Sequence, residues 1–133
     1  MAKNNYFYGL GRRKTSTARV HLKSGSGDFV INEKTAGQYF SASPKLLSRL
    51  NVPFTALDLN PQKFAISVKV SGGGQASQLE AICLGVAKAL IEVNPDYKAT
   101  LKRSGLTGRD PRERERKKAG FRSARKKRQF TKR

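Results

Sequence analysis

The side chains with the clearest chemical potential are the cations near the end of the chain, from Arg109 to Arg133. This stretch holds 13 of the 28 Lys and Arg residues against three Asp and Glu, and its only large apolar side chains are Phe121 and Phe130. Because so little apolar surface cannot offset the entropy of ordering, we expect the stretch to be disordered when alone in water. Its cations would displace counterions from a phosphate backbone, so a polyanion is the expected partner. A solvated tail without a ligand is the simpler alternative.

A second cluster of cations lies near the beginning of the chain. Arg12, Arg13 and Lys14 are adjacent, within a stretch at 11–16 that the sequence predicts as a turn. Three neighbouring cations flanked by glycine and hydroxyl groups suit contacts with phosphate. An ordinary hairpin turn that happens to be charged explains the same residues.

The next stretch, 17–23, alternates strictly between apolar and basic or polar side chains. This period of two predicts a strand with one face on a core and the other face, which includes Arg19, open to an anionic partner. His21 lies on the same predicted open face. It has no Ser, Cys or Asp companion nearby in sequence, so an exposed strand position is the favoured interpretation and a catalytic base the alternative.

Two further features, a glycine-rich turn and a cysteine, occur in the nucleotide-binding or catalytic sites of other proteins, but their surroundings in this sequence do not fit those roles. The Gly72–Gly74 turn between a predicted strand and a predicted helix resembles the layout that cradles phosphate, yet GGGQASQ lacks the spacing of nucleotide-binding loops. Cys83 lies on a predicted apolar helix stripe and is expected to be a small core residue, not a nucleophile. One His and one Cys are too few for a zinc site. We therefore expect no catalytic residues, no metal and no cofactor.

The elements that must position these residues follow from periodicity and breakers. Strands are predicted at 6–10, 17–23, 29–32 and 64–70, with 29–32 closing a hairpin on 17–23. Short helices are predicted from a Thr35 cap through Phe40 and from Ser43-Pro44, and 51–61 is predicted to be a connecting segment. The main helix has Ser77 and Glu80 at capping-box spacing, with a start one turn earlier as the alternative. It ends at Asn94-Pro95 and is followed by a short helix over 96–103.

The length and composition bound the architecture and the compartment. With 133 residues, a formal net charge of +19 and a pI near 10.8, the chain fits one domain with an anionic partner. We expect a globular body at 1–104 and a basic tail at 105–133. No apolar stretch is long enough to span a membrane, the N-terminus resembles no signal or transit peptide, and a lone cysteine suits a reducing cytosol.

Three separated motifs together resemble one family. Tyr8–Ser16 with Ala18-Arg19-Val20, then Val68–Gly74, then Arg109-Asp110, Glu115–Lys118 and the ending Gln129–Arg133 are similar to the universal ninth protein of the small ribosomal subunit, of the bacterial type. The resemblance covers nearly the whole chain. It departs from the family pattern at Arg128, where many members have proline before this ending, so the backbone near the tip is less restricted here.

The resemblance implies a fold and a set of contacts. The fold is α+β: a two-layer sandwich of a mostly antiparallel sheet with helices on one face, a left-handed βαβ crossover and a long extended basic C-terminal tail. The partners are the ribosomal RNA of the subunit head, neighbouring head proteins and the peptidyl-site transfer RNA. The residues expected to contact transfer RNA are Arg128, Gln129, Phe130, Lys132 and Arg133. Those expected to contact ribosomal RNA, some from the resemblance and the rest as cations of the strands and tail, are Arg12, Arg13, Lys14, Arg19, Lys69, Arg109, Arg112, Arg114, Arg116, Lys117, Lys118, Arg122, Arg125, Lys126 and Lys127.

Three other classes of protein share the charge. The first alternative is a nonspecific nucleic-acid coating or RNA-chaperone protein. A small kinase is conceivable by analogy of fold only, but no constellation of acids and metal ligands is evident. A cationic membrane-active protein is the third, and it would bind anionic vesicles after nuclease treatment. None of the three accounts for the combination of this body with this ending.

Overall fold

The structure is a computed structural model that describes residues 6–41, 43–108, 110–113 and 115–126. It contains a mixed five-stranded sheet in the order β1-β2-β5-β3-β4. The pairs β1–β2, β2–β5 and β3–β4 are antiparallel and β3–β5 is parallel. The α+β class and the mostly antiparallel sheet are thus confirmed. The strands are β1 (Phe7–Arg13), β2 (Ser16–Ser24), β3 (Phe29–Ile31), β4 (Lys34–Thr35) and β5 (Phe64–Ser71).

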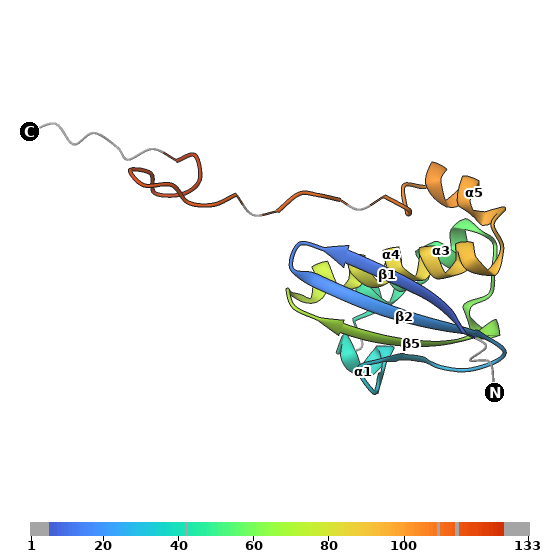
Figure 1. Ribbon diagram of the computed structural model, residues 1–133. Helices are drawn as coiled ribbons and strands as arrows, with labels where there is room; N and C mark the ends of the chain where they lie inside the picture. Colours follow the sequence, from blue (N-terminus) through green and yellow to red (C-terminus); the bar gives the residue numbers. More distant parts are fainter. Residues whose placement is uncertain (1–5, 42, 109, 114, 127–133) are drawn as a thin grey trace, which may run out of the picture.

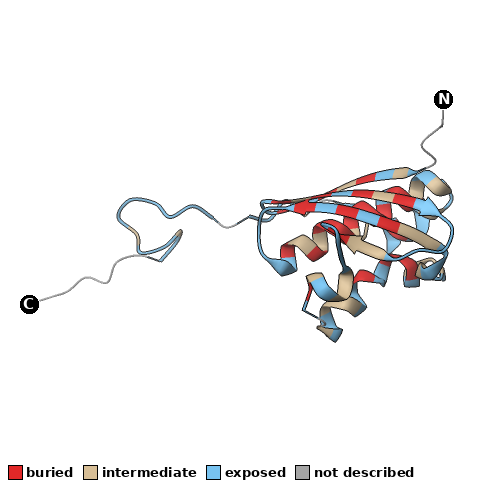
Figure 2. Ribbon diagram, turned by 90° about the horizontal axis from the view of Figure 1, so that it is seen from below, coloured by how far each residue is buried: buried red, intermediate tan, exposed pale blue. Residues whose placement is uncertain are grey.

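Helices cover one face of this sheet (Figure 1). The longest, α4, packs on β1 and β2 and touches β5. Along β2 the side chains of Ala18, Val20 and Leu22 are fully buried, while those between them are not, an alternation visible in Figure 2. The predicted alternation of residues 17–23 is therefore confirmed. The helices are α1 (Ala36–Tyr39), α2 (Pro44–Leu50), α3 (Val52–Ala56), η1 (Pro61–Lys63), α4 (Gln75–Val93) and α5 (Tyr97–Arg103).

Two glycines let β1 lie directly against α4. A Cβ atom added to Gly11 would lie 1.7 Å from the carbonyl oxygen of Ala81, and one added to Gly9 would lie 1.9 Å from that of Gly85. Both obstacles are helix backbone, so no side chain can rotate away from them. Glycine at alternate positions of this strand is therefore what permits the close strand–helix contact.

The turn predicted at 11–16 is shorter than expected. Strand β1 continues through Arg13, β2 begins at Ser16, and only Lys14 and Thr15 form the turn, with Lys14 at φ 53°. Gly11 thus lies inside a strand, because its role is close packing on α4 and not turn formation. The Ser16 hydroxyl is buried and donates to the carbonyl oxygen of Gly72 at 2.9 Å, so it joins two segments of the body.

The predicted hairpin between β2 and the strand after it is wrong. β3 pairs with β5 and not with β2, whose second edge is taken by β5 along residues 64–71. An eight-residue alternating strand buries far more apolar surface against β2 than a three-residue strand can. Asn32 then extends the pairing past the end of β3, since its side-chain amide donates to the Val70 carbonyl oxygen and accepts from the Val70 N–H, both at 2.9 Å.

The segment predicted as a connection at 51–61 contains the helix α3, and η1 begins at its last residue. Pro53 lies in the first turn of α3 and Pro61 begins η1, positions where a missing N–H costs nothing. The prolines therefore start helices here and do not break them. Phe54 of α3 is fully buried in the core and lies beside Phe64, with ring centroids 5.9 Å apart.

The remaining helices follow the sequence closely. Thr35 caps α1 through the backbone N–H of Gln38, and α5 ends before Ser104 as predicted. The main helix begins one turn earlier than the Ser77 cap implies. Gly74 is its N-cap, and the Ser77 hydroxyl accepts from the Gly74 N–H at 3.2 Å.

The chain crosses from β3 to the parallel strand β5 through β4, α1, α2, α3 and η1. The left hand of this crossover, the division at residue 104 and the extended form of the tail stay predictions. Among the described residues after α5, the chain leaves the helices and bends into a loop at 115–126 (Figure 1).

Candidate nucleic-acid interface

The end of the β1–β2 hairpin presents cations in two directions. Strand alternation places Arg12 on the sheet face away from α4, where it is exposed, and turns Arg13 toward α4, where its side chain is only 11% exposed. Lys14 lies exposed in the turn. The three adjacent cations therefore have different surroundings, and only Arg12 and Lys14 are open to a partner.

Arg13 connects the body to the beginning of the tail. Its guanidinium donates from Nε to a carboxylate oxygen of Glu80, and from Nη1 to the carbonyl oxygen of Arg112 at 3.0 Å. Nη1 also lies 3.3 Å from Asp110. Arg49 of α2 approaches the other oxygen of Glu80 at 3.5 Å. The end of β1, the first turns of α4 and the beginning of the tail thus meet at the buried Arg13, and α2 joins them through Glu80.

Asp110 is held ionised at this junction. The Arg112 side chain donates to its carboxylate at 2.7 and 2.9 Å, and the Arg112 backbone N–H donates at 2.9 Å. These hydrogen bonds, the side-chain ones first, lower the pKa of Asp110 to about 2. The carboxylate therefore stays charged at any physiological pH and fixes the turn through which the chain leaves the body.

Arg13→Met is expected to destabilise the body by about 1–3 kcal/mol, because it leaves the Glu80 carboxylate with one poorer partner and the Arg112 carbonyl oxygen with none from Arg13. Amide hydrogen exchange at Arg112, whose backbone N–H donates to Asp110, should also accelerate. The matched control is Arg12→Met, which removes an exposed cation from the neighbouring position and should change stability by less than about 0.5 kcal/mol. Equal effects of the two substitutions in urea denaturation would contradict the anchoring role.

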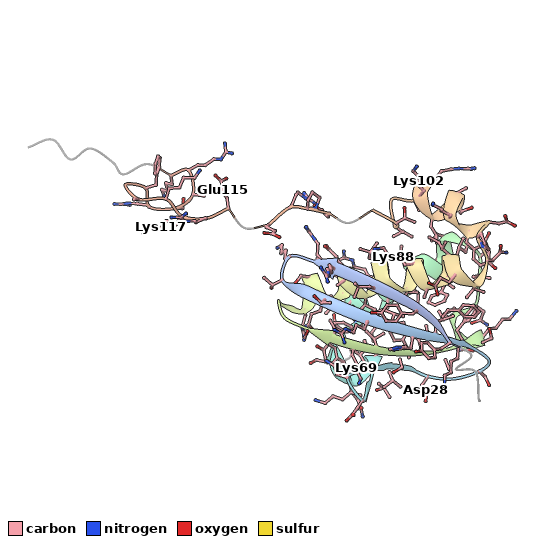
Figure 3. The ribbon with its side chains drawn as sticks, viewed as in Figure 1. Asp28, Lys69, Lys88, Lys102, Glu115 and Lys117 are labelled. Atoms are coloured by element: carbon pink, nitrogen blue, oxygen red, sulfur yellow. The ribbon has the colours of Figure 1, made fainter. Side chains whose placement is uncertain are left out.

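The open sheet face carries a pair of opposed cations. We define this face as Tyr8, Leu10 and Arg12 of β1, Thr17, Arg19, His21 and Lys23 of β2, and Ser67, Lys69 and Ser71 of β5. Arg19 and Lys69 are register partners across β2 and β5, and both are exposed. Figure 3 shows Lys69 on the face turned away from α4. Like charges directly opposite one another destabilise a sheet, so this pair gains from a bound anion.

A cleft of about 280 Å³ lies beside the Arg13 junction, and Cys83 forms part of its wall. The thiol donates to the carbonyl oxygen of Arg49 at 3.2 Å. Burial raises the pKa of Cys83 to about 12, so the thiol stays protonated at neutral pH and is a poor nucleophile. Cys83 is half-buried and packs against the core from the cleft wall, so the prediction that it is no nucleophile agrees with the structure, whereas its place is the edge of the core and not the interior.

The described tail residues fold into a loop around one carboxylate. Glu115 accepts from Lys118 at 2.8 Å and from Arg125 at 2.9 Å, and these hydrogen bonds lower the pKa of Glu115. Figure 3 shows Glu115 and Lys117 in this loop. Four other cations of the loop are exposed, namely Arg116, Lys117, Arg122 and Lys126.

The predicted contact residues thus fall into three groups. Arg12, Lys14, Arg19 and Lys69 are exposed on the hairpin and the open sheet face, whereas Arg13 is buried. In the tail, Arg112, Lys118 and Arg125 are exposed but paired with carboxylates. The other exposed cations of the tail loop are Arg116, Lys117, Arg122 and Lys126. The predicted contacts outside the described residues are Arg109, Arg114, Lys127, Arg128, Gln129, Phe130, Lys132 and Arg133.

Two residues of the site escaped sequence reasoning. Arg49 and Glu80 join the Arg13 junction from α2 and α4. The sequence pattern predicts only a helix-capping role for Glu80. An isolated acid in the first turns of an apolar helix indicates that a cation lies nearby in the fold. The sequence does not identify that cation, because Arg13 lies 67 residues away from Glu80.

No group of three or more His, Cys, Asp or Glu side chains is placed to hold a metal ion within the residues that the structure describes. No helix in the same part of the chain is both long and apolar enough to cross a bilayer.

Comparison with known proteins identifies the family. The model of the family described as "Ribosomal protein S9/S16" matches residues 11–133. The chain belongs to this ribosomal protein family. It is 47% identical over 127 residues to "Small ribosomal subunit protein uS9" of Mycoplasma mobile, covering 96% of each chain, and 47% identical over 127 residues to the protein of that name from Mycoplasmopsis synoviae, covering 96% of this chain and 95% of that one. "Small ribosomal subunit protein uS9c" of Arabidopsis thaliana is 46% identical over 125 residues, covering 94% of this chain and 60% of that one.

Membership of the S9/S16 family confirms the resemblance drawn from the three motifs. The matched region begins at Gly11, inside β1, and extends through the tail to the last residue. Body and tail therefore belong to the same family pattern. The family is one of ribosomal proteins, not of enzymes.

Proposed function

We propose that this chain is a structural constituent of the small ribosomal subunit, where its body and tail bind the ribosomal RNA of the subunit head. The observation that carries the proposal is the family match over residues 11–133, which takes in the basic tail as well as the body. The relatives named as small-subunit proteins match over nearly the full chain. The working compartment is the cytoplasm, on the ribosome, and proteins of the head are the expected neighbours.

The contacts with ribosomal RNA divide by their surroundings. Arg12, Lys14, Arg19 and Lys69 contact phosphates from the hairpin and the sheet, since all four are exposed. The tail cations release counterions along the RNA backbone, which gives affinity without reading sequence. Arg13 was also expected at the RNA. Its burial and its three partners favour a positioning role, in which it aims the tail from the body.

The last residues contact the peptidyl-site transfer RNA. The chain from residue 109 onward spans at most roughly 80 Å when extended, which is enough to reach a site distant from the body. Lys132 and Arg133 supply phosphate contacts there, with Arg128, Gln129 and Phe130 beside them. Such contacts hold the transfer RNA in place and do not discriminate between sequences.

Sedimentation tests the proposal as a whole. A cell extract is run on a gradient at magnesium low enough to separate the ribosomal subunits, and the fractions are probed for this chain. Confinement to the small-subunit peak after a high-salt wash is expected. A smear over all RNA-containing fractions that salt removes would instead support the nonspecific RNA-binding alternative.

Deletion of Lys132 and Arg133 is expected to weaken transfer-RNA binding in the peptidyl site by about 1–3 kcal/mol, the scale of charged hydrogen bonds. Subunit assembly should be largely unchanged, because most of the tail cations remain. Filter binding of transfer RNA to purified subunits measures the loss. The double variant Lys102→Ala/Arg103→Ala removes the same charge from the exposed end of α5 and should bind normally. Unchanged transfer-RNA affinity after the deletion would refute this role.

A further inference from the structure

The open sheet face combines aromatic rings with cations. Tyr8 and His21 are register partners on β1 and β2, with ring centroids 5.4 Å apart. Tyr6 contacts the same imidazole, edge to face, at 4.7 Å. Tyr6 and Tyr8 are 38% and 39% exposed, and they are the only exposed large aromatic residues in the described part of the chain. Burial in the core therefore does not explain these rings.

The contacts with His21 leave at least one face of each tyrosine ring uncovered by the imidazole. The Tyr6–His21 planes meet at 72° and the Tyr8–His21 planes at 58°, so neither pair is stacked face to face. The rigid position of Tyr8 on a paired strand also lowers the entropy lost when a ligand stacks on it. Aromatic side chains on a sheet that keep their faces accessible are a general platform for nucleic-acid bases.

The cations lie one step along the strands from the rings. The cross-strand row of Tyr8, His21 and Ser67 is followed by the row of Leu10, Arg19 and Lys69. Two residues along a strand correspond to roughly 7 Å, and neighbouring strands lie roughly 4.8 Å apart, so Arg19 is the diagonal neighbour of Tyr8 and Lys69 lies one strand further across the sheet. A nucleotide stacked on Tyr8 can therefore direct its phosphate to Arg19, and the next phosphate of an unpaired strand that continues across the sheet can lie between Arg19 and Lys69, relieving the repulsion of the opposed cations.

The positive charge of the open sheet face favours RNA over a neighbouring protein as the bound partner. None of the side chains that define the open sheet face is a carboxylate. A neighbouring protein would have to present a strongly acidic surface, whereas RNA supplies phosphates and flat bases together. A regular duplex conceals its base faces, so only unpaired nucleotides use both features.

We propose that the open sheet face binds an unpaired stretch of ribosomal RNA, with bases stacked on Tyr8 and Tyr6 and phosphates held by Arg19 and Lys69. This rests on the proposed function, since it takes RNA as the partner. It adds a mode of recognition, base stacking, to the phosphate contacts made by the rest of the chain. The tail binds paired and unpaired RNA by charge, whereas this face discriminates between them.

A single fluorescent reporter separates this face from the tail. The chain has no tryptophan, so Tyr8→Trp introduces one indole at the platform. The full chain is titrated with a fluorescently labelled 12-nucleotide oligoadenylate, and with the same strand paired to oligouridylate. Anisotropy of the label reports total binding, and indole emission reports stacking. At equal occupancy, the single strand should quench the indole at least twofold more than the duplex.

Substitutions test the chemistry at 0.5 M salt, where the electrostatic contribution of the tail is weakened. Tyr8→Ser should lower the affinity for the single strand by roughly tenfold, whereas Tyr8→Phe, which keeps the ring, should lower it less than twofold. Arg19→Gln/Lys69→Gln should weaken the quenching of the Tyr8→Trp indole. The matched double variant Lys98→Gln/Arg103→Gln, on α5, should not.

The outcomes distinguish this inference from the proposed function. Two results would overturn the stacking platform: full RNA binding without indole quenching, and equal quenching by the single strand and the duplex. Either result is compatible with sedimentation of the chain in the small-subunit peak, so the proposed function would stand. A photocrosslink from Tyr8 to a peptide of a neighbouring protein in intact subunits, instead of to a nucleotide, also overturns it. Absence of the chain from the small-subunit peak would instead refute the proposed function.

Discussion

Gly11→Ala is expected to destabilise the body by about 3 kcal/mol, at the upper end of the usual cost of adding atoms to a packed interior. The new Cβ would lie 1.7 Å from the Ala81 carbonyl oxygen and 2.6 Å from the backbone nitrogen of Gly85. Because both atoms belong to the α4 backbone, strand and helix must separate. The separation loosens packing on Ala81 and Ala89, which are fully buried. Urea denaturation followed by far-ultraviolet circular dichroism measures the loss.

Gly37→Ala provides the control. Gly37 lies within α1, has no atom within 4 Å of an added Cβ, and is not in the left-handed region. Replacing a helical glycine with alanine at such a site should leave stability unchanged or raise it by up to about 1 kcal/mol. If Gly11→Ala unfolds within about 0.5 kcal/mol of the native chain, the close contact between β1 and α4 is not as described, since even favourable relaxation costs more.

Gly11 also illustrates which parts of the fold a sequence can reveal. Periodicity identified β2 with its buried face and also the strand β5, because alternation is recorded in each strand by itself. It did not reveal that β1 continues through Gly11 to Arg13. Glycine carries no side-chain signal of burial, and its usual place in turns hid a role that depends on a helix some 70 residues later in the sequence.

The pairing of strands and ions was similarly hidden. Nothing in residues 29–32 distinguishes a partner that precedes them from one that follows, so proximity in the sequence favours β2 although the actual partner is the distant β5. In the same way, the run of Arg12, Arg13 and Lys14 reads as one basic patch. Strand alternation turns the middle residue inward, but its carboxylate partners come from α4 and from the tail, and only tertiary structure brings them together.

Arg116→Gln/Lys117→Gln/Arg122→Gln/Lys126→Gln is expected to lower affinity for small-subunit ribosomal RNA by about a thousandfold at 0.1 M salt. Each phosphate contact contributes a slope of about 0.7 to 0.9 in a plot of log affinity against log salt, so four contacts amount to about 3. These four cations are exposed in the loop around Glu115, whose carboxylate is already paired with Lys118 and Arg125. Filter binding across a salt series measures both the affinity and the slope.

The decisive comparison is a variant of equal charge. Lys45→Gln/Lys63→Gln/Lys88→Gln/Lys98→Gln removes four exposed cations from helices of the body, and Lys88 is visible on α4 in Figure 3. If the tail is a localised interface, this variant keeps most of its affinity and its slope, because counterions are released only where phosphates are contacted. If both variants lose affinity equally, net charge alone governs binding. The tail would then contribute only to the overall positive charge of the protein. The junction of Arg13 with Asp110 and Arg112 would in that case not position an RNA-binding segment.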